Sequence, residues 1–210
     1  RLCIGTFGNG VLYLDGQRFV PYPYSDTNQQ QMFISCMTAD SEGNLWVGSI
    51  FQGLTCYQKD GREKLFTREN SDLNTNSLTC LHSDHDGHLY IGSSTGLYIL
   101  DTRSGTFLKW AGVLNPLEDV FITSLYKDCR GLIWIGTRTG LKVYDERHNT
   151  FYQILQKDGL SNPYVRTLIE DNSKNVWAST DNGLTCIQTK RLDNGGYSFV
   201  CTPFFEEDGL

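Results

Sequence analysis

The sequence predicts an all-β fold made of β-propeller blades, each blade a sheet of four antiparallel strands. One motif recurs at a constant spacing, and every copy contains short strand-like runs separated by turn residues. An aromatic slot of the motif holds Trp46, Tyr90, Trp134 and Trp177, at spacings of 44, 44 and 43 residues. Four short strands repeated every ~40–45 residues are typical of a propeller blade. With a truncated first copy around Cys3, the chain is expected to hold about five blades.

A second anchor follows the first in every copy. It is a glycine with an aliphatic residue after it, and the glycines lie at spacings of 43, 43, 44 and 43 residues, namely Gly10, Gly53, Gly96, Gly140 and Gly183. Two independent anchors with one period indicate a structural repeat. An α-solenoid has a comparable period, but no window of this sequence shows a sustained 3.6-residue pattern.

The fourth copy shows how each blade is built. The run 120–126 is rich in β-branched and aromatic residues, which predicts a strand. Residues 128–131 predict a turn, because Asp caps backbone N–H groups and Gly tolerates positive φ. The next strand, 132–137, is apolar on both faces and must be covered on both, as between two blades. Two more strands, 141–145 and 150–154, complete the sheet. The aromatic slot is expected to wedge between adjacent blades.

The repeat boundaries predict a single propeller segment over residues 1–210. The expected blades are 1–31, 32–74, 75–118, 119–161 and 162–210. The first blade lacks its inner strand, and the last residues echo the Asp-Gly-Leu that precedes the fifth blade. We therefore expect a fragment of a larger propeller. An open arc exposes blade faces and strand edges, so we also expect self-association through these surfaces.

Composition narrows the classes of partner. The formal net charge is −6 and no basic cluster is present, which disfavours nucleic acid. No apolar run approaches the ~18 residues of a membrane span. The seven cysteines form no Cys-x-x-Cys pair, and Cys56 and Cys186 share a slot with Ile99 and Val143, as small core residues would. No cofactor is expected.

The motif resembles the two-component regulator propeller repeat. Residues 128–145 and 158–162 carry its pattern of D-x-x-G, L-I-W-I-G-T, G-L, Y-D and D-G-L-S-N nearly in full. Departures occur at Cys3 and Tyr90, which replace Trp, at Lys174, which replaces the turn Gly, and in an insert at 191–198. This family supplies the extracytoplasmic sensor region of hybrid two-component histidine kinases, many of which sense oligosaccharides.

The resemblance implies a sensor segment that responds to an oligosaccharide and passes the signal across the membrane. It also implies a periplasmic location, as part of an inner-membrane protein. No kinase motif is present in the chain, so enzyme activity is not expected of it. Two alternatives stay open: a scaffold for protein–protein contact or dimerisation, and a propeller enzyme such as a lyase or hydrolase, which needs clustered His, Glu or Asp.

Candidate ligand contacts come from the loops. In propellers the connections between the second and third strands, and those between blades, share one face, and ligands commonly bind there. Aromatic rings beside Asn, Asp and Arg suit a sugar, since the ring stacks on its apolar face and the planar polar groups bind its hydroxyls. The candidates are Phe51, Trp110, Arg138, Asp181, Asn182 and Tyr164. Ordinary solvated loops are the simpler interpretation of any one of them.

One hairpin has a composition that suits a metal. His82, His85, Asp86 and His88 lie within seven residues. The repeat offers a plainer explanation, because the turn between them is already specified by the motif and polar residues are expected there. No metal site is therefore predicted, and these residues are kept as a candidate only.

Overall fold

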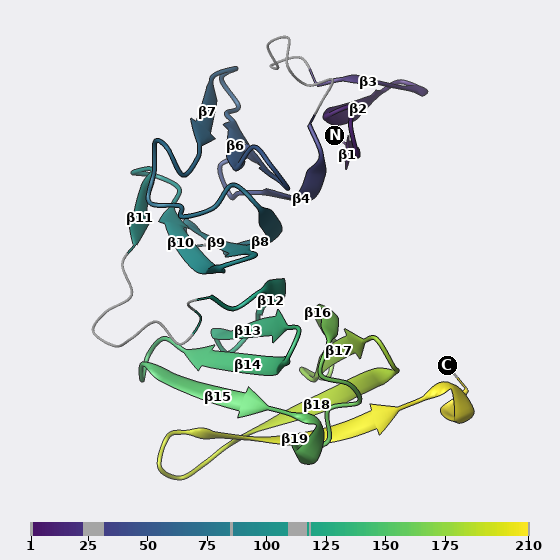
Figure 1. Ribbon diagram of the computed structural model, residues 1–210. Helices are drawn as coiled ribbons and strands as arrows, with labels where there is room; N and C mark the ends of the chain where they lie inside the picture. The colour runs from purple at the N-terminus through teal and green to yellow at the C-terminus, as the bar shows by residue number, and fades with distance from the viewer. Residues whose placement is uncertain (1, 23–31, 85, 109–116, 118, 210) are drawn as a thin grey trace. The chain divides into compact units, whose positions relative to one another are not determined.

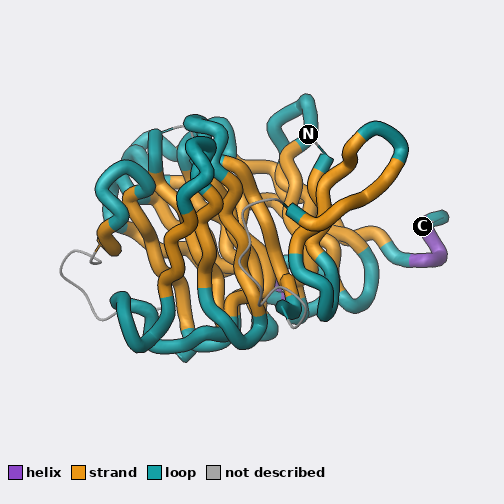
Figure 2. Tube along the Cα trace, turned by 90° about the horizontal axis from the view of Figure 1, so that it is seen from above, coloured by secondary structure: helices purple, strands orange, loops and turns teal. Residues whose placement is uncertain are grey.

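The computed structural model describes residues 2–22, 32–84, 86–108, 117 and 119–209. The described chain is almost entirely strand and turn, with helix only in short 3-10 turns (Figure 2). Its strands form antiparallel sheets in sequence order, so the predicted all-β blade architecture is confirmed. The chain divides into two compact units, residues 1–120 and residues 121–210. That both belong to one propeller segment stays a prediction.

The first unit contains three sheets (Figure 1). The three strands of the first sheet are β1 (Cys3–Gly5), β2 (Val11–Asp15) and β3 (Arg18–Pro21). The second sheet has β4 (Ile34–Ala39), β5 (Leu45–Ser49), β6 (Leu54–Tyr57) and β7 (Glu63–Phe66). The third has β8 (Leu78–Ser83), β9 (His88–Ser93), β10 (Gly96–Asp101) and β11 (Thr106–Leu108).

The second unit contains two four-stranded sheets. The fourth sheet has β12 (Ile122–Lys127), β13 (Leu132–Thr137), β14 (Gly140–Asp145) and β15 (Thr150–Ile154). The fifth has β16 (Val165–Glu170), β17 (Val176–Thr180), β18 (Leu184–Arg191) and β19 (Tyr197–Phe204). Two 3-10 turns follow the outer strands, η2 (Gln156–Asp158) and η3 (Glu206–Asp208).

Hydrophobic cores lie between neighbouring sheets within each unit. In the second unit Trp134, Leu132 and Val143 of the fourth sheet pack with Val165 and Ile187 of the fifth, and all five are buried. This arrangement explains why β13 is apolar on both faces, since each face is covered by protein. In the first unit an equivalent core joins the second and third sheets around Trp46.

In the second and fourth sheets, the glycine two residues after the buried tryptophan is required by close packing of the first two strands. A Cβ at Gly136 would lie 2.2 Å from the Ser124 hydroxyl, and one at Gly48 would lie 2.5 Å from the Cys36 sulfur. Both neighbours come immediately after a bulge in the first strand of their sheet. The Trp-x-Gly pattern of the sequence is therefore a packing constraint as well as a repeat marker.

An aspartate organises the turn between the first two strands of every four-stranded sheet; it is buried in the second, third and fourth sheets and half-buried in the fifth. In the fourth sheet, Asp128 Oδ1 accepts hydrogen bonds from the backbone N–H groups of Arg130 (2.9 Å) and Leu132 (3.0 Å). Its other oxygen accepts from the indole N–H of Trp134 at 3.0 Å. The capping role follows from the turn residues, whereas the bond to the indole emerges only from the fold.

The same arrangement recurs in the other copies. Asp40 accepts from the indole of Trp46 at 2.8 Å, and Asp171 from that of Trp177 at 2.8 Å. In the third sheet, Asp84 accepts from the Tyr90 hydroxyl at 3.5 Å. One carboxylate thus closes the turn and also satisfies the polar atom of the aromatic wedge.

Trp134→Phe tests this pairing, because it removes the indole N–H and keeps an aromatic ring. We expect the free energy of unfolding to fall by about 1–3 kcal/mol, the usual penalty for leaving a buried polar group without a partner. Urea denaturation at neutral pH measures the loss. Trp177→Phe is the matched comparison, and its loss should be smaller because Trp177 is only half-buried. Equal stability of wild type and Trp134→Phe would contradict the pairing.

The pH dependence of stability provides a second test. The indole N–H of Trp177, followed by the backbone N–H of Asn175, lowers the pKa of Asp171 below its usual value of 3.8. A carboxyl whose folded-state pKa is depressed stabilises the fold above its unfolded pKa and loses that contribution as the pH falls through the lowered value. Asp171→Asn should therefore be less stable than wild type at pH 7, with the difference shrinking below about pH 4. Thermal melts between pH 2 and pH 7 measure this, and a pH-independent difference would contradict it.

Candidate functional site

Arg138 lies on the turn between β13 and β14, where the sequence predicted a ligand contact. Its guanidinium carbon is 3.6 Å from the centroid of the Phe121 ring and 5.7 Å from that of Tyr164. Guanidinium groups stack on aromatic faces and keep their N–H edge available for hydrogen bonds. Arg138 is exposed, and within the described part of the chain it has no carboxylate at ion-pair distance. The side chain is thus held in position with its donors open to solvent.

Tyr164 and Asp181 meet beside this stack. The guanidinium carbon of Arg166 lies 4.2 Å from the Tyr164 ring centroid, and its Nε donates to the Asp181 carboxylate. The Asp181 backbone N–H donates to the Tyr164 carbonyl at 3.1 Å, which ties the turn between β17 and β18 to the connection that precedes β16. Asp181 also raises the pKa of Arg166. These residues, with Arg138 and Phe121, are called the second-unit loop cluster below.

The turns that carry the cluster are closed by a hydroxyl at the end of the second strand. Thr137 Oγ1 donates to the Gly140 carbonyl at 2.7 Å and accepts from the Thr139 N–H at 3.1 Å. Thr180 does the same, donating to the Gly183 carbonyl at 3.0 Å and accepting from the Asn182 N–H at 3.2 Å. Because the hydroxyl fixes the backbone of the turn, the two intervening side chains project on a rigid base.

The structure therefore brings four of the six predicted residues to the loops of the second unit. Arg138, Tyr164 and Asp181 belong to the cluster, and the exposed Asn182 follows Asp181 on the same turn. Trp110 lies outside the described residues. Nothing in these contacts tests whether the residues bind a ligand, so the site stays a prediction.

Sequence reasoning missed Phe121 and Arg166. Phe121 lies immediately before β12, and Arg166 is the second residue of β16. Both residues lie next to loops that the sequence had singled out as candidate ligand contacts. The sequence signal that could have revealed them is an aromatic residue and an arginine at the start of two successive blades. Their place in the cluster depends on cation–π contacts with residues of other loops, and such contacts cannot be read from the local sequence.

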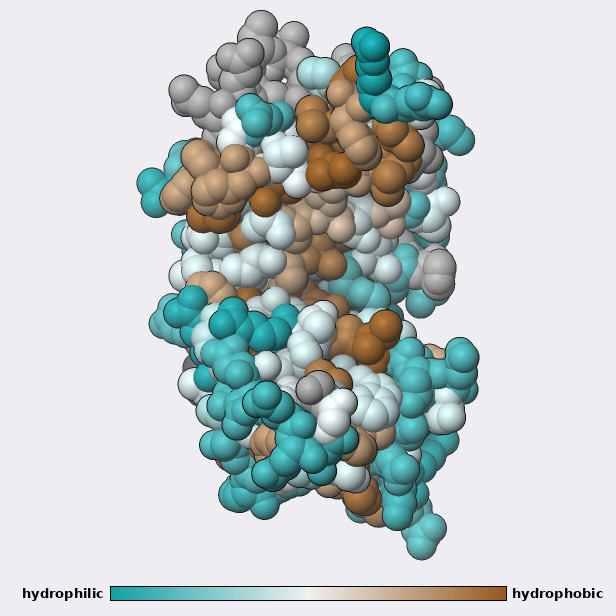
Figure 3. Space-filling model, turned by 90° about the vertical axis from the view of Figure 1, so that its right-hand side faces the viewer, coloured by the Kyte–Doolittle hydropathy of each residue, from teal (hydrophilic) through white to brown (hydrophobic). Residues whose placement is uncertain are grey.

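Phe51, the remaining candidate, lies in the first unit and belongs to an apolar cluster. Its ring centroid is 5.6 Å from that of Phe33, which is 4.5 Å from that of Phe7. Phe7 is 73% exposed and Phe51 65%, so these rings are presented to solvent. Apolar surface gathers on the first unit in Figure 3. We call Phe7, Phe33 and Phe51 the phenylalanine patch.

The histidine-rich hairpin is explained in part by the turn aspartate. His88 Nδ1 lies 3.2 Å from Asp84 Oδ2, and the backbone N–H groups of Asp86 and His88 donate to Asp84 Oδ1. His82 lies in β8 with its ring centroid 6.3 Å from that of Tyr90. His85 lies outside the described residues. Within the described part of the chain, no group of three or more His, Cys, Asp or Glu side chains could hold a metal ion.

The second-unit loop cluster offers chemistry suited to binding. It combines two guanidinium groups, one carboxylate and two aromatic rings, and Asn182 adds an amide beside it. Such groups hydrogen-bond hydroxyls and carboxylates and contact apolar ring faces. None of the cluster's own side chains is a nucleophile paired with a base, the arrangement that covalent catalysis uses.

Sheets of this kind, repeated with a turn aspartate and a buried aromatic, define a β-propeller chain. Residues 28–51 and 159–182 match the family model of the two-component regulator propeller. These two segments match that repeat, which confirms the resemblance identified from the sequence. No curated protein sequence matches the chain.

Solved structures share the fold. The extracellular domain of a proposed hybrid two-component system from B. thetaiotaomicron matches with a TM-score of 0.79 and 19% identity, over 99% of this chain and 28% of that one. The extracellular domain of a proposed one-component system from the same organism matches with a TM-score of 0.71 and 24% identity, over 93% and 25%. The chain thus spans about a quarter of the length of these domains.

An enzyme is also among the structures with this fold. Virginiamycin B lyase from Staphylococcus aureus matches with a TM-score of 0.59 and 14% identity, over 79% of this chain and 54% of the lyase. At this identity the likeness concerns the fold alone. As for membranes, none of the described helices has the length and hydrophobicity to span one.

Proposed function

We propose that the chain is a segment of an extracytoplasmic sensor propeller in a two-component signalling protein. The match to the two-component regulator propeller supports this, as does the shared fold with extracellular domains of such systems. On this proposal the parent is a membrane-anchored histidine kinase of the inner membrane, and the propeller lies in the periplasm. The segment itself binds and transmits, and the kinase chemistry belongs to other parts of the parent.

We further propose that the second-unit loop cluster contributes to binding an oligosaccharide. The observation that carries this is the stacking of Arg138 on Phe121, which presents an unpaired guanidinium edge next to the ring of Tyr164. A guanidinium and a nearby carboxylate, Asp181, supply donors and acceptors for neighbouring hydroxyl groups. Because the turns are closed by Thr137 and Thr180, little ordering is left for the ligand to impose, which favours affinity.

Thermal-shift measurements against a panel of oligosaccharides test this proposal. A ligand that binds only the folded chain raises the melting temperature by mass action. We expect a saturable shift with at least one oligosaccharide, and we expect Arg138→Ala to reduce it because the variant loses the open guanidinium. Arg147→Ala is the matched control, since Arg147 is an exposed arginine on the turn between β14 and β15 and is not part of the cluster. Equal shifts in both variants would remove the cluster from the binding site.

The phenylalanine patch favours a second candidate function, a surface for protein–protein contact. Three neighbouring phenylalanine rings, two of them mostly exposed, form the kind of apolar surface that marks interaction sites. On this proposal the first unit associates with another copy of the chain. This agrees with the self-association expected from the sequence for exposed propeller surfaces.

The double variant Phe7→Ser/Phe51→Ser tests the patch. Both side chains are largely exposed, so the fold should be kept while the apolar surface is lost. If the patch mediates self-association, sedimentation velocity should show wild type shifting to larger species with concentration and the variant remaining a monomer. Leu65→Ser is the control, an exposed apolar residue outside the patch. A wild type that stays monomeric at high concentration, or a variant that associates equally, would contradict this function.

A further inference from the structure

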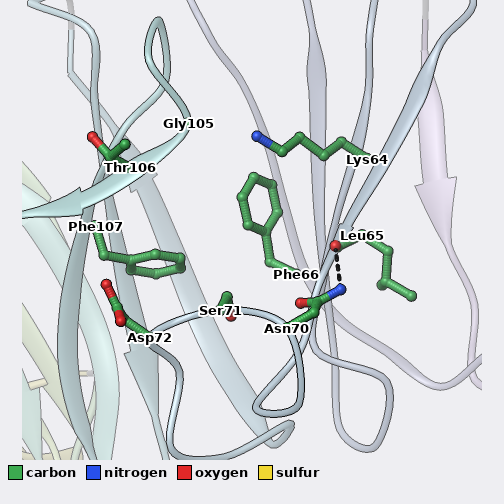
Figure 4. Close-up of a pocket in the computed structure, with 9 residues that line it drawn as sticks. All are labelled: Lys64, Leu65, Phe66, Asn70, Ser71, Asp72, Gly105, Thr106 and Phe107. Carbon is green, nitrogen blue, oxygen red and sulfur yellow. Dashed lines mark hydrogen bonds between the residues drawn. The ribbon is translucent and has the colours of Figure 1, made fainter.

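A pocket of about 440 Å³ opens in the first unit between the outer strands of the second and third sheets (Figure 4). Lys64, Leu65 and Phe66 of β7 form one wall; Gly105, just before β11, with Thr106 and Phe107 of β11 forms the other. The loop after β7 closes it with Asn70, Ser71 and Asp72. A volume of this size falls in the range of small-molecule sites. The pocket belongs to neither the second-unit loop cluster nor the phenylalanine patch.

Aromatic rings and one cation define the centre of the pocket. The Phe66 and Phe107 ring centroids are 5.9 Å apart in an edge-to-face arrangement. Lys64 Nζ lies 4.7 Å from the Phe66 centroid. A Cβ placed on Gly105 would come within 2.4 Å of this nitrogen, so the ammonium reaches across to the turn between β10 and β11. Glycine is favoured at this position by its backbone, which has a φ of +69°.

Most of the neutral polar groups in the pocket are already used by the protein. The Asn70 side chain accepts from the Thr67 N–H at 2.7 Å and donates to the Leu65 carbonyl at 3.0 Å. The Ser71 hydroxyl donates to the Thr67 carbonyl at 2.6 Å, and the Thr106 hydroxyl is 2.7 Å from that of Ser104. These bonds shape the wall and leave little capacity for a ligand.

Two opposite charges remain. Among the described residues neither Lys64 nor Asp72 has an ion-pair partner within 4.0 Å, and the two are not paired with each other. Figure 4 shows the Lys64 nitrogen at one end of the pocket and the Asp72 carboxylate at the other, with the aromatic rings between them. The pocket thus presents an ammonium group and a carboxylate that are separated by the apolar surface of the two phenylalanine rings.

The corresponding position in the second unit holds a packed aromatic side chain. Strand register places Lys64 opposite Cys56, and it places Tyr152 opposite Val143. Because Cys56 and Val143 share one slot of the repeat, Lys64 and Tyr152 occupy equivalent positions. Tyr152 packs edge-to-face on Tyr197 and Phe199, and its hydroxyl accepts from the Tyr197 N–H at 3.2 Å. The eight-residue β19 supplies these partners, whereas β11 has three residues. Tyr152 and its aromatic partners thus occupy the position that Lys64 takes beside the pocket.

We propose that this pocket binds a small zwitterion, a molecule that carries a carboxylate and an ammonium group on an apolar body. Lys64 pairs with the carboxylate, Asp72 with the ammonium, and the apolar part contacts Phe66 and Phe107. Both side chains are exposed and hydrated in the free protein. A ligand with both charges gains an ion pair at each end of the pocket, whereas a ligand with one charge gains only one. This site is independent of the proposed oligosaccharide site.

Isothermal titration of the whole chain with L-phenylalanine tests the proposal. Saturable binding is expected, with an affinity at least about tenfold lower in Lys64→Met and in Asp72→Asn, because each variant loses one ion pair. Lys59→Met is the matched control, since Lys59 is an exposed lysine on the turn between β6 and β7. It should bind as wild type does.

Two analogues sharpen the test. 3-Phenylpropionate lacks the ammonium and 2-phenylethylamine lacks the carboxylate, and each should bind about tenfold or more weakly than L-phenylalanine. No detectable L-phenylalanine binding by the folded chain would overturn the proposal. Equal binding of the analogues, or of the Lys64→Met and Asp72→Asn variants, would also overturn it, since both charges would then be unnecessary. Because the oligosaccharide test uses Arg138 in the other unit, the two proposals fail independently.

Discussion

Each four-stranded blade depends on one carboxylate that both closes a turn and accepts a hydrogen bond from the aromatic side chain between the sheets. The turn aspartate accepts the backbone N–H groups of its own hairpin and the polar atom of the aromatic side chain that fills the space between sheets. Burying an indole without a partner for its N–H costs free energy, as does burying a carboxylate that lacks donors. Placing the two together removes both costs and fixes the distance between the turn and the core. This constraint explains why the aspartate and the aromatic residue are always six residues apart in the sequence.

The constraint leaves the opposite end of each hairpin free to vary. There a threonine or serine hydroxyl at the end of the second strand closes the next turn, as Thr137 and Ser93 do. The two residues on the turn after Thr137 are exposed, and the two after Ser93 are half-buried. Substitutions at these positions change the surface without disturbing the buried bonds. In the second unit, arginine and aspartate occupy positions on these turns, and aromatic side chains lie beside them. This separation of a fixed scaffold from variable loops is how one fold serves many binding functions.

The outer strands vary for a different reason. They lie farthest from the turn aspartate, and their lengths range from the three residues of β11 to the eight of β19. A short outer strand leaves space that a longer neighbour would fill. Lys64 and Tyr152 occupy equivalent positions, yet one lines a pocket and the other is packed against aromatic side chains. Differences in strand length can therefore create a site without changing the blade.

Much of the fold followed from the sequence, because the period and the turn chemistry are local. Asp128 was expected to cap its turn and Trp134 to lie between sheets, and both do. The bond between them was not foreseen, since it depends on the curvature of the hairpin. Likewise Arg138 was singled out from its loop, whereas Arg166 was not, because its role comes from the ring that a separate loop places beside it.

Native-state hydrogen exchange of the Trp134 indole and the Leu132 amide, followed by NMR, tests the central claim most directly. If the Asp128 carboxylate holds the turn and the wedge together, both protons should exchange only through cooperative opening, with the same high free energy as the strand amides of β13. Exchange of the indole as fast as that of an exposed loop amide would show that the pair opens on its own, and would contradict the account.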